Sequence, residues 1–209
     1  MTPLRSLPLA FAVLALGACT PNERPTAGPV ANAASWQTVA TDVDRRRLRD
    51  WRTAFAAGLS QARAAGHADA VAREGLLLQP DAAVGGGIPN GHYRCRVIKL
   101  GARSPGLLPF VSYPAFNCRI ATSGRLQSFT KLSGSQRQVG YIFPNDQLRT
   151  VFLGTLVLGD EQRAIPYGAD NDRDLAGYVE RIGPNRWRLI LPNPRFESLI
   201  DVVELVPAP

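Results

Sequence analysis

The sequence predicts an α+β fold, with an N-terminal helical hairpin packed on an antiparallel barrel-like or sandwich β-domain. Residues 42–65 repeat apolar side chains at steps of three and four, the period of one helical face. From residue 88 onward, short segments alternate apolar and polar residues between turn-forming Gly, Pro, Asn and Asp. The connections are too short for the crossovers that parallel strands require, so the strands are expected to pair antiparallel.

The first predicted helix spans residues 42–65. Its apolar stripe consists of Leu48, Trp51, Phe55, Leu59 and Ala62. Thr41 or Asp42 is suited to the N-cap, and Gly66 to the C-terminal cap. A second short helix at residues 68–78 is expected to turn back on the first and complete the hairpin.

Three arginines lie on a neighbouring face of the first helix: Arg45, Arg49 and Arg52. Nearby aspartates can pair with some of them, as on an ordinary solvated surface. A contact with anionic lipid or lipopolysaccharide is the alternative. The sequence leaves both possibilities open.

Eight short strands are expected in the second part of the chain. They cover residues 93–97, 116–120, 126–132, 138–143, 150–158, 175–181, 186–191 and 201–206. Residues 151–158 are apolar on both faces, which predicts a central strand or one whose outer side is covered by the N-terminal helices. The three glycines at 85–87 form a hinge between helices and strands.

Residues 1–19 have the pattern of an export signal. Arg5 precedes an apolar run at residues 7–16, which is too short to cross a bilayer core of about 30 Å. The Leu-Gly-Ala-Cys segment at residues 16–19 resembles bacterial lipoprotein signals. The resemblance implies cleavage before Cys19 and acylation of Cys19, palmitate included. Thr20, in place of an aspartate, implies an outer-membrane location on the periplasmic side.

The signal divides the chain into three parts. Residues 1–18 form the signal peptide, residues 19–35 a flexible tether, and residues 36–209 one globular domain. The tether is rich in Pro, Ala, Asn and Thr, cannot bury a core, and would reach on the order of 20 Å. Within the domain, the helical hairpin covers 36–80 and the antiparallel β-domain covers 88–209.

Two cysteines, Cys95 and Cys118, remain once Cys19 is assigned to lipid. In an oxidising periplasm two such cysteines pair more often than they stay free. The alternating patterns place both on inward strand faces, which suits a bridge or two adjacent buried thiols. A bridge would close a loop of about 24 residues and stabilise the fold by roughly 3 to 3.5 kcal/mol. A reactive thiol, the alternative, would need His92 as its base.

No catalytic motif is found, and no cofactor is expected. The only histidines, His67 and His92, lie beside glycines and lack partners at the spacing of zinc ligands. The Gly-x-Ser-x-Gly motif of serine hydrolases is absent. Paired carboxylates could still serve a glycan hydrolase, although no pair stands out. The candidate acids are Glu74, Asp81, Glu180, Glu197 and Glu204.

The alternating aspartates within residues 170–174 resemble the start of a calcium loop. Leu175, however, stands where that loop needs glycine, and Arg181 where it needs a bidentate glutamate. A solvated hairpin loop is therefore expected, and no metal site.

The chain is basic, with 24 Lys and Arg against 17 Asp and Glu and a formal charge of +7, which falls to +6 when Arg5 is removed. Lys99 and Lys131 are its only lysines. Export excludes nucleic acid as an expected partner. The expected partners are the membrane, through the lipid anchor, and an envelope protein or a small apolar ligand.

Segments 44–51, 92–101 and 186–189 resemble an uncharacterised family of bacterial envelope proteins with a domain of unknown function. The resemblance covers about four fifths of the chain and implies no activity.

A second resemblance is to the lipoprotein inhibitors of lysozyme. In those small disulfide-bonded barrels a Tyr-x-Cys strand precedes a Ser-Gly loop that enters the lysozyme cleft. Here Tyr93-Arg94-Cys95 precedes Ser133-Gly134-Ser135. The resemblance implies that Ser133, Gly134 and Ser135 contact a partner. This chain is longer than those inhibitors, and Arg137 has no acidic neighbour in sequence.

The sequence therefore favours a non-catalytic envelope lipoprotein that binds a ligand or an envelope partner. A lysozyme inhibitor and a hydrolase of envelope glycans or lipids are the alternatives.

Overall fold

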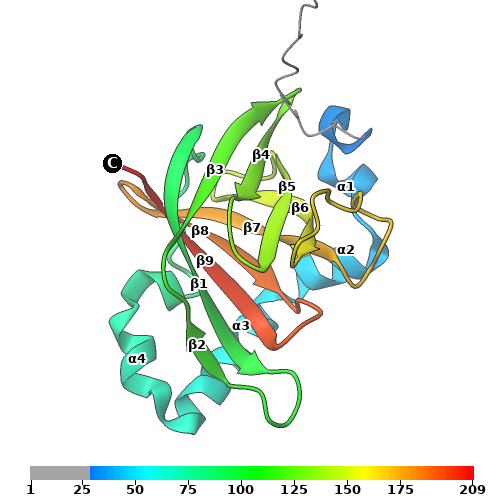
Figure 1. The fold of residues 1–209 in the computed structure, drawn as a ribbon. Helices are drawn as coiled ribbons and strands as arrows, with labels where there is room; N and C mark the ends of the chain where they lie inside the picture. The colour runs from blue at the N-terminus through cyan, green and yellow to red at the C-terminus, as the bar shows by residue number, and fades with distance from the viewer. Residues whose placement is uncertain (1–28) are drawn as a thin grey trace, which may run out of the picture.

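A computed structural model describes residues 29–209 of the chain, so Cys19 and the predicted signal peptide lie outside the described residues. Short helices come first, and nine strands follow (Figure 1). Eight strands close an antiparallel barrel, and one extra strand extends it. The α+β class is confirmed, and the closed barrel decides against the sandwich.

The barrel strands pair with their neighbours in chain order, and the last returns to the first. They are β1 (Gly91–Ala102), β3 (Phe116–Ser123), β4 (Leu126–Lys131), β5 (Gln136–Phe143), β6 (Arg149–Leu158), β7 (Asp174–Gly183), β8 (Arg186–Pro192) and β9 (Ser198–Pro207). The β1–β9 ladder closes the barrel and runs from Tyr93↔Pro207 to Ala102↔Ser198. All pairings are antiparallel, as the short connections predicted.

The extra strand, β2 (Phe110–Ser112), was not predicted, because three residues are too few to show alternation. It pairs with the second half of β1 at residues 98–100, whereas β3 pairs with the first half at residues 91–95. The β2 and β3 strands thus follow one another along the same edge of β1, and the Tyr113 amide between them donates to the Val97 carbonyl at 2.9 Å. The β3–β4 pairing ends at Cys118↔Lys131, so the wall opens between residues 113–116 and the turn that follows β4.

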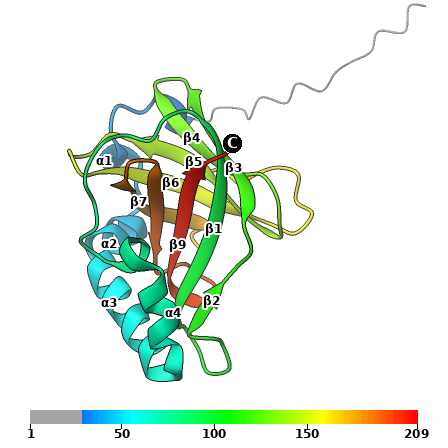
Figure 2. The ribbon, with the colours of Figure 1, turned by 90° about the vertical axis from the view of Figure 1, so that its left-hand side faces the viewer.

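The predicted helix at 42–65 is divided into α2 (Asp42–Arg49) and α3 (Trp51–Ala62), with a bend at Asp50. The bend lets α2 pack on β7 while α3 packs on β1 and β9, so the pair follows the curved barrel wall (Figure 2). Thr41 is confirmed as the N-cap, since its Oγ1 accepts from the Asp44 amide at 3.2 Å.

Gly66 ends this helical stretch, as predicted. Its φ of +86° lies in the left-handed region that glycine adopts without strain. Gly66 lies within the π-helical turn Arg63–His67 and interrupts it, and α4 (Ala68–Arg73) and the 3-10 helix Gly75–Leu78 follow. The predicted second helix is therefore a shorter α-helix with a 3-10 extension.

Two apolar layers join the helices to the outside of the barrel. The α3 stripe of Trp51, Phe55 and Leu59 covers outward residues of β1, β8 and β9. Leu48 of α2 packs with Val151 and Leu153 of β6, together with residues of α1 (Trp36–Val39). The expected helical cover on the outer side of residues 151–158 is thus observed.

A buried ion pair fixes the segment after α4 to the barrel wall. Arg188 is fully buried and donates to Glu180 Oε2 at 2.7 and 2.9 Å. The same guanidinium donates to the carbonyls of Leu77 and Gln79 at 2.9 and 2.7 Å. These bonds satisfy backbone groups that would otherwise be buried without partners.

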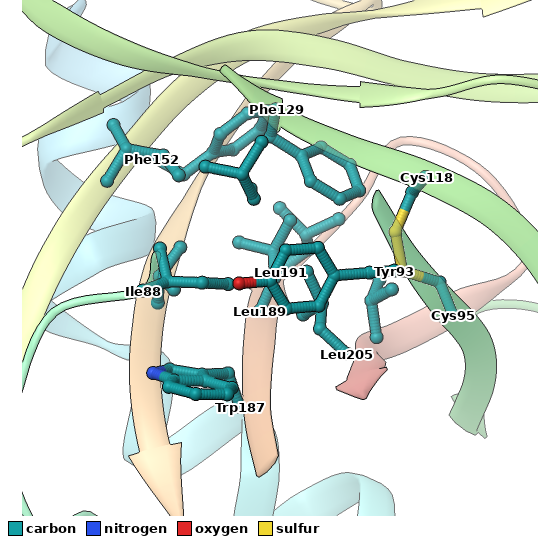
Figure 3. Close-up of a cluster of buried hydrophobic side chains, with 14 of the residues drawn as sticks. Ile88, Tyr93, Cys95, Cys118, Phe129, Phe152, Trp187, Leu189, Leu191 and Leu205 are labelled. Carbon is teal, nitrogen blue, oxygen red and sulfur yellow. A yellow bond between two sulfur atoms is a disulfide. The ribbon is translucent and has the colours of Figure 1, made fainter. Parts of the chain in front are cut away.

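The barrel interior is apolar at the end where β1 begins. Tyr93, Phe129, Phe152 and Trp187 converge there with leucines of β8 and β9 (Figure 3). The 84–90 linker crosses this end and inserts Ile88 into the cluster. Trp187 Nε1 donates to the Gly87 carbonyl at 3.2 Å, and the Tyr93 hydroxyl to the Pro89 carbonyl at 2.6 Å. Side chains and the linker together fill this end.

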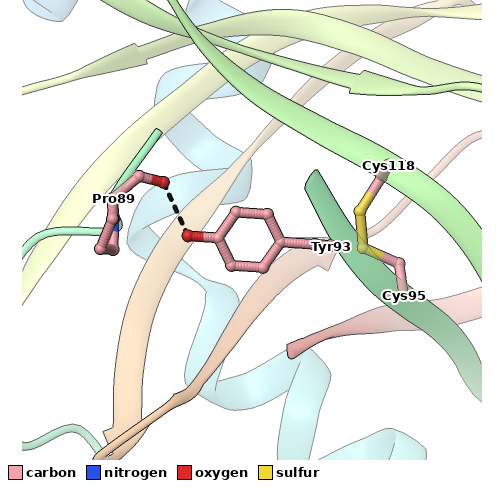
Figure 4. The surroundings of a disulfide bond; sticks show 4 residues. All are labelled: Pro89, Tyr93, Cys95 and Cys118. Atoms are coloured by element: carbon pink, nitrogen blue, oxygen red, sulfur yellow. Dashed lines mark hydrogen bonds between the residues drawn. A yellow bond between two sulfur atoms is a disulfide. The ribbon is translucent and has the colours of Figure 1, made fainter. Parts of the chain in front are cut away.

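The Cys95–Cys118 disulfide is present in the same apolar region, as predicted (Figure 4). The two Cα atoms are 6.1 Å apart, and both residues are fully buried. The bridge joins β1 to β3 near the start of β3.

The first described residues also pack on the barrel. Pro29–Asn32 forms a 3-10 helix, and Ala31 is fully buried. This part of the expected tether lies against the turn between β3 and β4, where a Cβ on Gly124 would lie 3.1 Å from the Ala31 carbonyl oxygen. None of the helices within residues 29–209 has both the length and the apolar character needed to cross a membrane.

Candidate functional site

The other end of the barrel interior is polar. Along β1 the inward side chains change from Tyr93, Cys95 and Val97 to Lys99. Opposite it in the ladder lies Asp201 of β9. The inward positions of β5 change in the same way, from Ile142 to the two glutamines 138 and 136. One half of each strand therefore forms an apolar core, and the other half lines a polar chamber.

A cavity of about 310 Å³ opens at this polar end, between residues 113–116 and the turn that joins β4 to β5. It is lined by Val97, Lys99, Tyr113, Pro114, Phe116, Lys131, Ser133, Gly134, Ser135, Gln136, Gln138 and Glu197. This volume is at the lower end of the range for small-molecule sites. Both lysines of the chain line it.

Lys99 is the centre of an ion cluster in the wall of the cavity. Its Nζ lies 3.2 Å from Asp201 Oδ2, 3.2 Å from Glu197 Oε2 and 3.3 Å from Gln136 Oε1. Burial by itself lowers the pKa of Lys99, but the carboxylates of Asp201 and Glu197 outweigh it and raise the pKa above its ordinary value. Lys99 is thus a charged, fully partnered ammonium.

Asp201 is also held by its neighbours. Its Oδ1 accepts from the Ser198 hydroxyl, and its Oδ2 accepts from Lys99. Burial nevertheless raises the pKa of this carboxyl. Gln136 completes the cluster, because its Nε2 donates to Glu197 Oε1 at 3.1 Å.

Lys131 differs from Lys99 in the partners that its ammonium has within the described part of the chain. Among residues 29–209 no carboxylate forms an ion pair with it, and its Nζ lies 4.3 Å from the centroid of the Phe116 ring. Burial lowers the pKa of Lys131, and the positive charges of Lys99 and Arg137 lower it further, which outweighs the opposite effect of the Asp201 carboxylate. The cavity therefore holds an ammonium group with unused hydrogen-bond donors.

Gln138 presents an unused acceptor. Its side chain is 3 % exposed, and its Oε1 has no hydrogen-bond partner among the described residues. Buried amide oxygens without a partner are rare, because losing water without replacement costs about 1–3 kcal/mol. A ligand with a donor group would satisfy it.

The predicted contact residues Ser133, Gly134 and Ser135 form the exposed rim of this cavity, in the turn between β4 and β5. Arg137 holds the turn: its guanidinium donates to the carbonyls of Gly134, Gly159 and Glu161. Its missing acidic partner is thus replaced by backbone oxygens. The rim is fixed to the neighbouring loop.

The three predicted arginines lie outside the barrel, on the helices. Arg45 Nε lies 3.3 Å from Asp42, and Arg52 lies 3.1 Å from Asp81, with its guanidinium 4.4 Å from the Trp51 ring centroid. Arg49 is exposed at the end of α2. These residues do not join the cavity, and exposed pairs of this kind contribute little to stability.

The aspartates of the 170–174 loop bind different partners. Asp172 pairs with Arg195 at 2.8 Å, and Asp174 accepts from the Gly168 amide at 2.9 Å. Burial raises the pKa of Asp174 to about 6. Within the described range, no group of three or more His, Cys, Asp or Glu could hold a metal ion.

The sequence analysis missed Lys99, Lys131 and Gln138, which line the cavity, and Asp201, which pairs with Lys99 in its wall. Two signals were available. The polar residues Lys99 and Gln138 stand in the inward phase of strands that are otherwise apolar. Of the only two lysines of this arginine-rich chain, Lys131 lies in a predicted strand, and Lys99 follows another by two residues.

A family model for a domain of unknown function, DUF4893, matches residues 36–205. The chain belongs to the DUF4893 family. The match runs from α1 to β9, so the barrel and its cavity lie within the DUF4893 domain. The predicted membership of a family of unknown function is confirmed. No curated protein and no solved structure matches the chain.

Proposed function

We propose that this DUF4893 protein is a non-catalytic binding protein that takes a small polar ligand into the barrel cavity. The observation that carries the proposal is the cavity of about 310 Å³, whose wall combines a partnered and an unpartnered lysine. The apolar end is filled by side chains. A polar ligand therefore fits the barrel better than an apolar one.

The arrangement of the acids supports binding rather than catalysis. Glu197 and Asp201 both face the cavity end, but each pairs with the ammonium of Lys99. A general acid must hold a proton that it can give to substrate, and a nucleophilic carboxylate must be free to attack. Because Glu197 and Asp201 both pair with the same ammonium, they are suited to stabilising the cavity wall and not to either of these catalytic roles. Formation of a hydrolysis product from an envelope glycan or lipid would instead show that the protein is a hydrolase.

We also propose that the protein is a lipoprotein on the periplasmic side of the outer membrane, anchored through acylated Cys19. The described chain begins beside the β3–β4 turn, and the cavity opens beside the β4–β5 turn, at the opposite end of β4. At about 3.3 Å per residue the six residues of β4 separate the turns by roughly 17 Å. This geometry favours a ligand taken from the periplasm over one taken from the bilayer.

Mass spectrometry tests the anchor. The chain purified from a bacterial host should begin at Cys19 and carry the mass of its acyl chains, and Cys19→Ala should abolish the added mass. An unmodified Cys19 in a soluble product would contradict the anchor without affecting the cavity.

Ligand binding is tested with the full-length chain in detergent. Thermal unfolding with a panel of sugar acids, hydroxy acids, amino acids and fatty acids, and native mass spectrometry with envelope extract, should reveal a small polar ligand. Ser135→Trp, at the exposed rim, should block it. Arg125→Trp, in the exposed turn at the opposite end of β4, is the matched control and should bind normally. Absence of any ligand, or binding unchanged by Ser135→Trp, would refute the proposal.

Lysozyme inhibition is the second candidate. The exposed Ser133-Gly134-Ser135 turn, which Arg137 fixes through the Gly134 carbonyl, supports it, because a preorganised loop loses less entropy on binding. The test is lysozyme turnover with the full-length chain in large molar excess. Unchanged turnover would end this candidate, and it would leave the cavity proposal in place.

A further inference from the structure

We propose that the ligand of this cavity is a small hydroxylated monocarboxylate, of which a sugar acid is the simplest example. Its carboxylate would pair with Lys131, and one of its hydroxyls would donate to Gln138 Oε1. This inference rests on the proposed function, because it assigns a chemistry to the ligand of the same cavity.

The charges of the chamber favour a single negative charge. Lys99 and Lys131 line the cavity, and the two carboxylates of its wall, Glu197 and Asp201, both bind Lys99. Arg137 lies outside the lining and binds carbonyl oxygens, so Lys131 is the cation left without an anion among the described residues. One monoanion would give Lys131 the partner that it lacks. A dianion such as a phosphate monoester would add a charge that Glu197 repels.

The position of Lys131 suits a bound carboxylate. Its side chain is partly buried, and burial lowers its pKa, because the surroundings compensate the ammonium poorly. A carboxylate that entered the cavity would restore to Lys131 the kind of partner that Lys99 already has. Bonds between charged groups in such sheltered places are shorter and stronger than those between neutral groups.

The unpaired oxygen of Gln138 indicates a hydroxyl on the ligand. Its side chain is 3 % exposed, lines the cavity and has no donor within reach among the described residues. A simple carboxylate such as acetate has no donor and would leave this oxygen unsatisfied. A site with a buried, unpaired polar group discriminates strongly against ligands that lack the matching group.

The remaining wall is apolar and aromatic. Tyr113, Pro114, Phe116 and Val97 line it. Carbon-bound hydrogens on the face of a sugar ring can pack on such a wall while the hydroxyls at the ring edge reach Gln138. The volume of about 310 Å³ accommodates a molecule of this size and leaves the rim at Ser133–Ser135 open.

The test compares three probes by calorimetry at low ionic strength, using the full-length chain in detergent: D-glucuronate, D-glucose and acetate. Glucuronate should bind at least tenfold more tightly than either of the others, since each lacks one of the two groups. Equal binding of acetate would overturn the role of the hydroxyl. Equal binding of glucose would overturn the role of the carboxylate.

Two variants assign the contacts. Lys131→Met should weaken the binding of glucuronate at least tenfold, to the affinity that wild type has for glucose. Gln138→Leu should weaken the binding of glucuronate to the affinity that wild type has for acetate. Both changes remove uncompensated polar groups, so both variants should unfold at or above the wild-type temperature. Arg94→Met, an equivalent change at an exposed position on the outside of β1, is the matched control. Glucuronate affinity unchanged by Lys131→Met would refute the assignment.

A free sugar acid and the terminal sugar acid of a glycan share this chemistry. An oligosaccharide that ends in glucuronate distinguishes the two sources. If it binds as tightly as free glucuronate, the remaining sugars leave the cavity through the open rim, and the end of a glycan is accepted. If it does not bind, the ligand is a free sugar acid. A ligand of another class that binds and is blocked by Ser135→Trp would overturn this inference and leave the proposed function standing. Failure of every panel member and of the extract would refute both.

Discussion

The two ends of the barrel interior are built by the same strands, yet one is filled and the other is open. At the filled end, Tyr93, Trp187 and the disulfide pack beneath the 84–90 linker. At the open end, Lys99 and Asp201 take the inward positions, and the β3–β4 pairing ends at Cys118↔Lys131. The comparison shows how a small barrel separates its tasks: burial of apolar surface stabilises one half, and unfilled polar space in the other half is available to a ligand.

The largest expected effect is at the filled end. Trp187→Ala should lower the free energy of unfolding by about 3–5 kcal/mol, because it leaves a cavity in a close-packed core. Denaturant unfolding measures the loss. Under native conditions the variant should still bind the cavity ligand, since Trp187 does not line the open end. Loss of binding in a folded variant would show that the two ends are coupled.

The disulfide has the next largest effect. Cys95→Ala combined with Cys118→Ala should cost about 3 kcal/mol, because the bridge no longer restricts the unfolded chain. Chemical denaturation of oxidised and reduced wild type provides the control, since reduction should reproduce most of the loss. A loss far below 1 kcal/mol would mean that packing around the cysteines, and not the bond, holds β1 against β3.

The ion cluster of the open end should contribute less. Lys99→Met should destabilise the fold by about 2 kcal/mol, because Asp201 is left buried without its cation, while Glu197 is 39 % exposed and can be hydrated. Lys99→Met combined with Asp201→Leu should recover most of the stability. Thermal unfolding of the four proteins of this double-mutant cycle measures the coupling. Additive losses would contradict the pairing.

The smallest effect concerns Asp174, which lies outside the barrel wall beneath α2. Its pKa of about 6 exceeds the ordinary value of 3.8, so the folded state binds a proton more tightly than the unfolded state does. The stability contributed by this group is present below about pH 4 and is lost as the pH rises through 6.

Asp174→Asn should therefore be more stable than wild type by about 1 kcal/mol at pH 7 and nearly equal to it at pH 4. Unfolding free energies measured at both pH values test this. Asn171→Ala, in the same loop, exposed and without a titratable group, is the control and should leave the pH dependence unchanged. A constant difference across this range would exclude titration of Asp174 as its cause.

Local patterns in the sequence were enough to predict much of the fold. The eight barrel strands, the Thr41 cap, the stop at Gly66 and the inward direction of Cys95 and Cys118 follow from periodicity and turn chemistry. The bend at Asp50 and the strand at 110–112 do not. The bend follows the curvature of a barrel that forms only in the folded state, and the strand is too short to show a pattern of its own.

The sequence by itself determined the α+β class, the antiparallel pairing and the inward positions of the two cysteines, because these depend on neighbours along the chain. Only the tertiary structure decided that the sheet closes into a barrel and that Lys99, Lys131 and Gln138 meet in one cavity. Those residues come from three strands, β1, β4 and β5, of which only β4 and β5 pair with each other. Their meeting depends on the register and closure of the barrel, which no single segment of the sequence specifies.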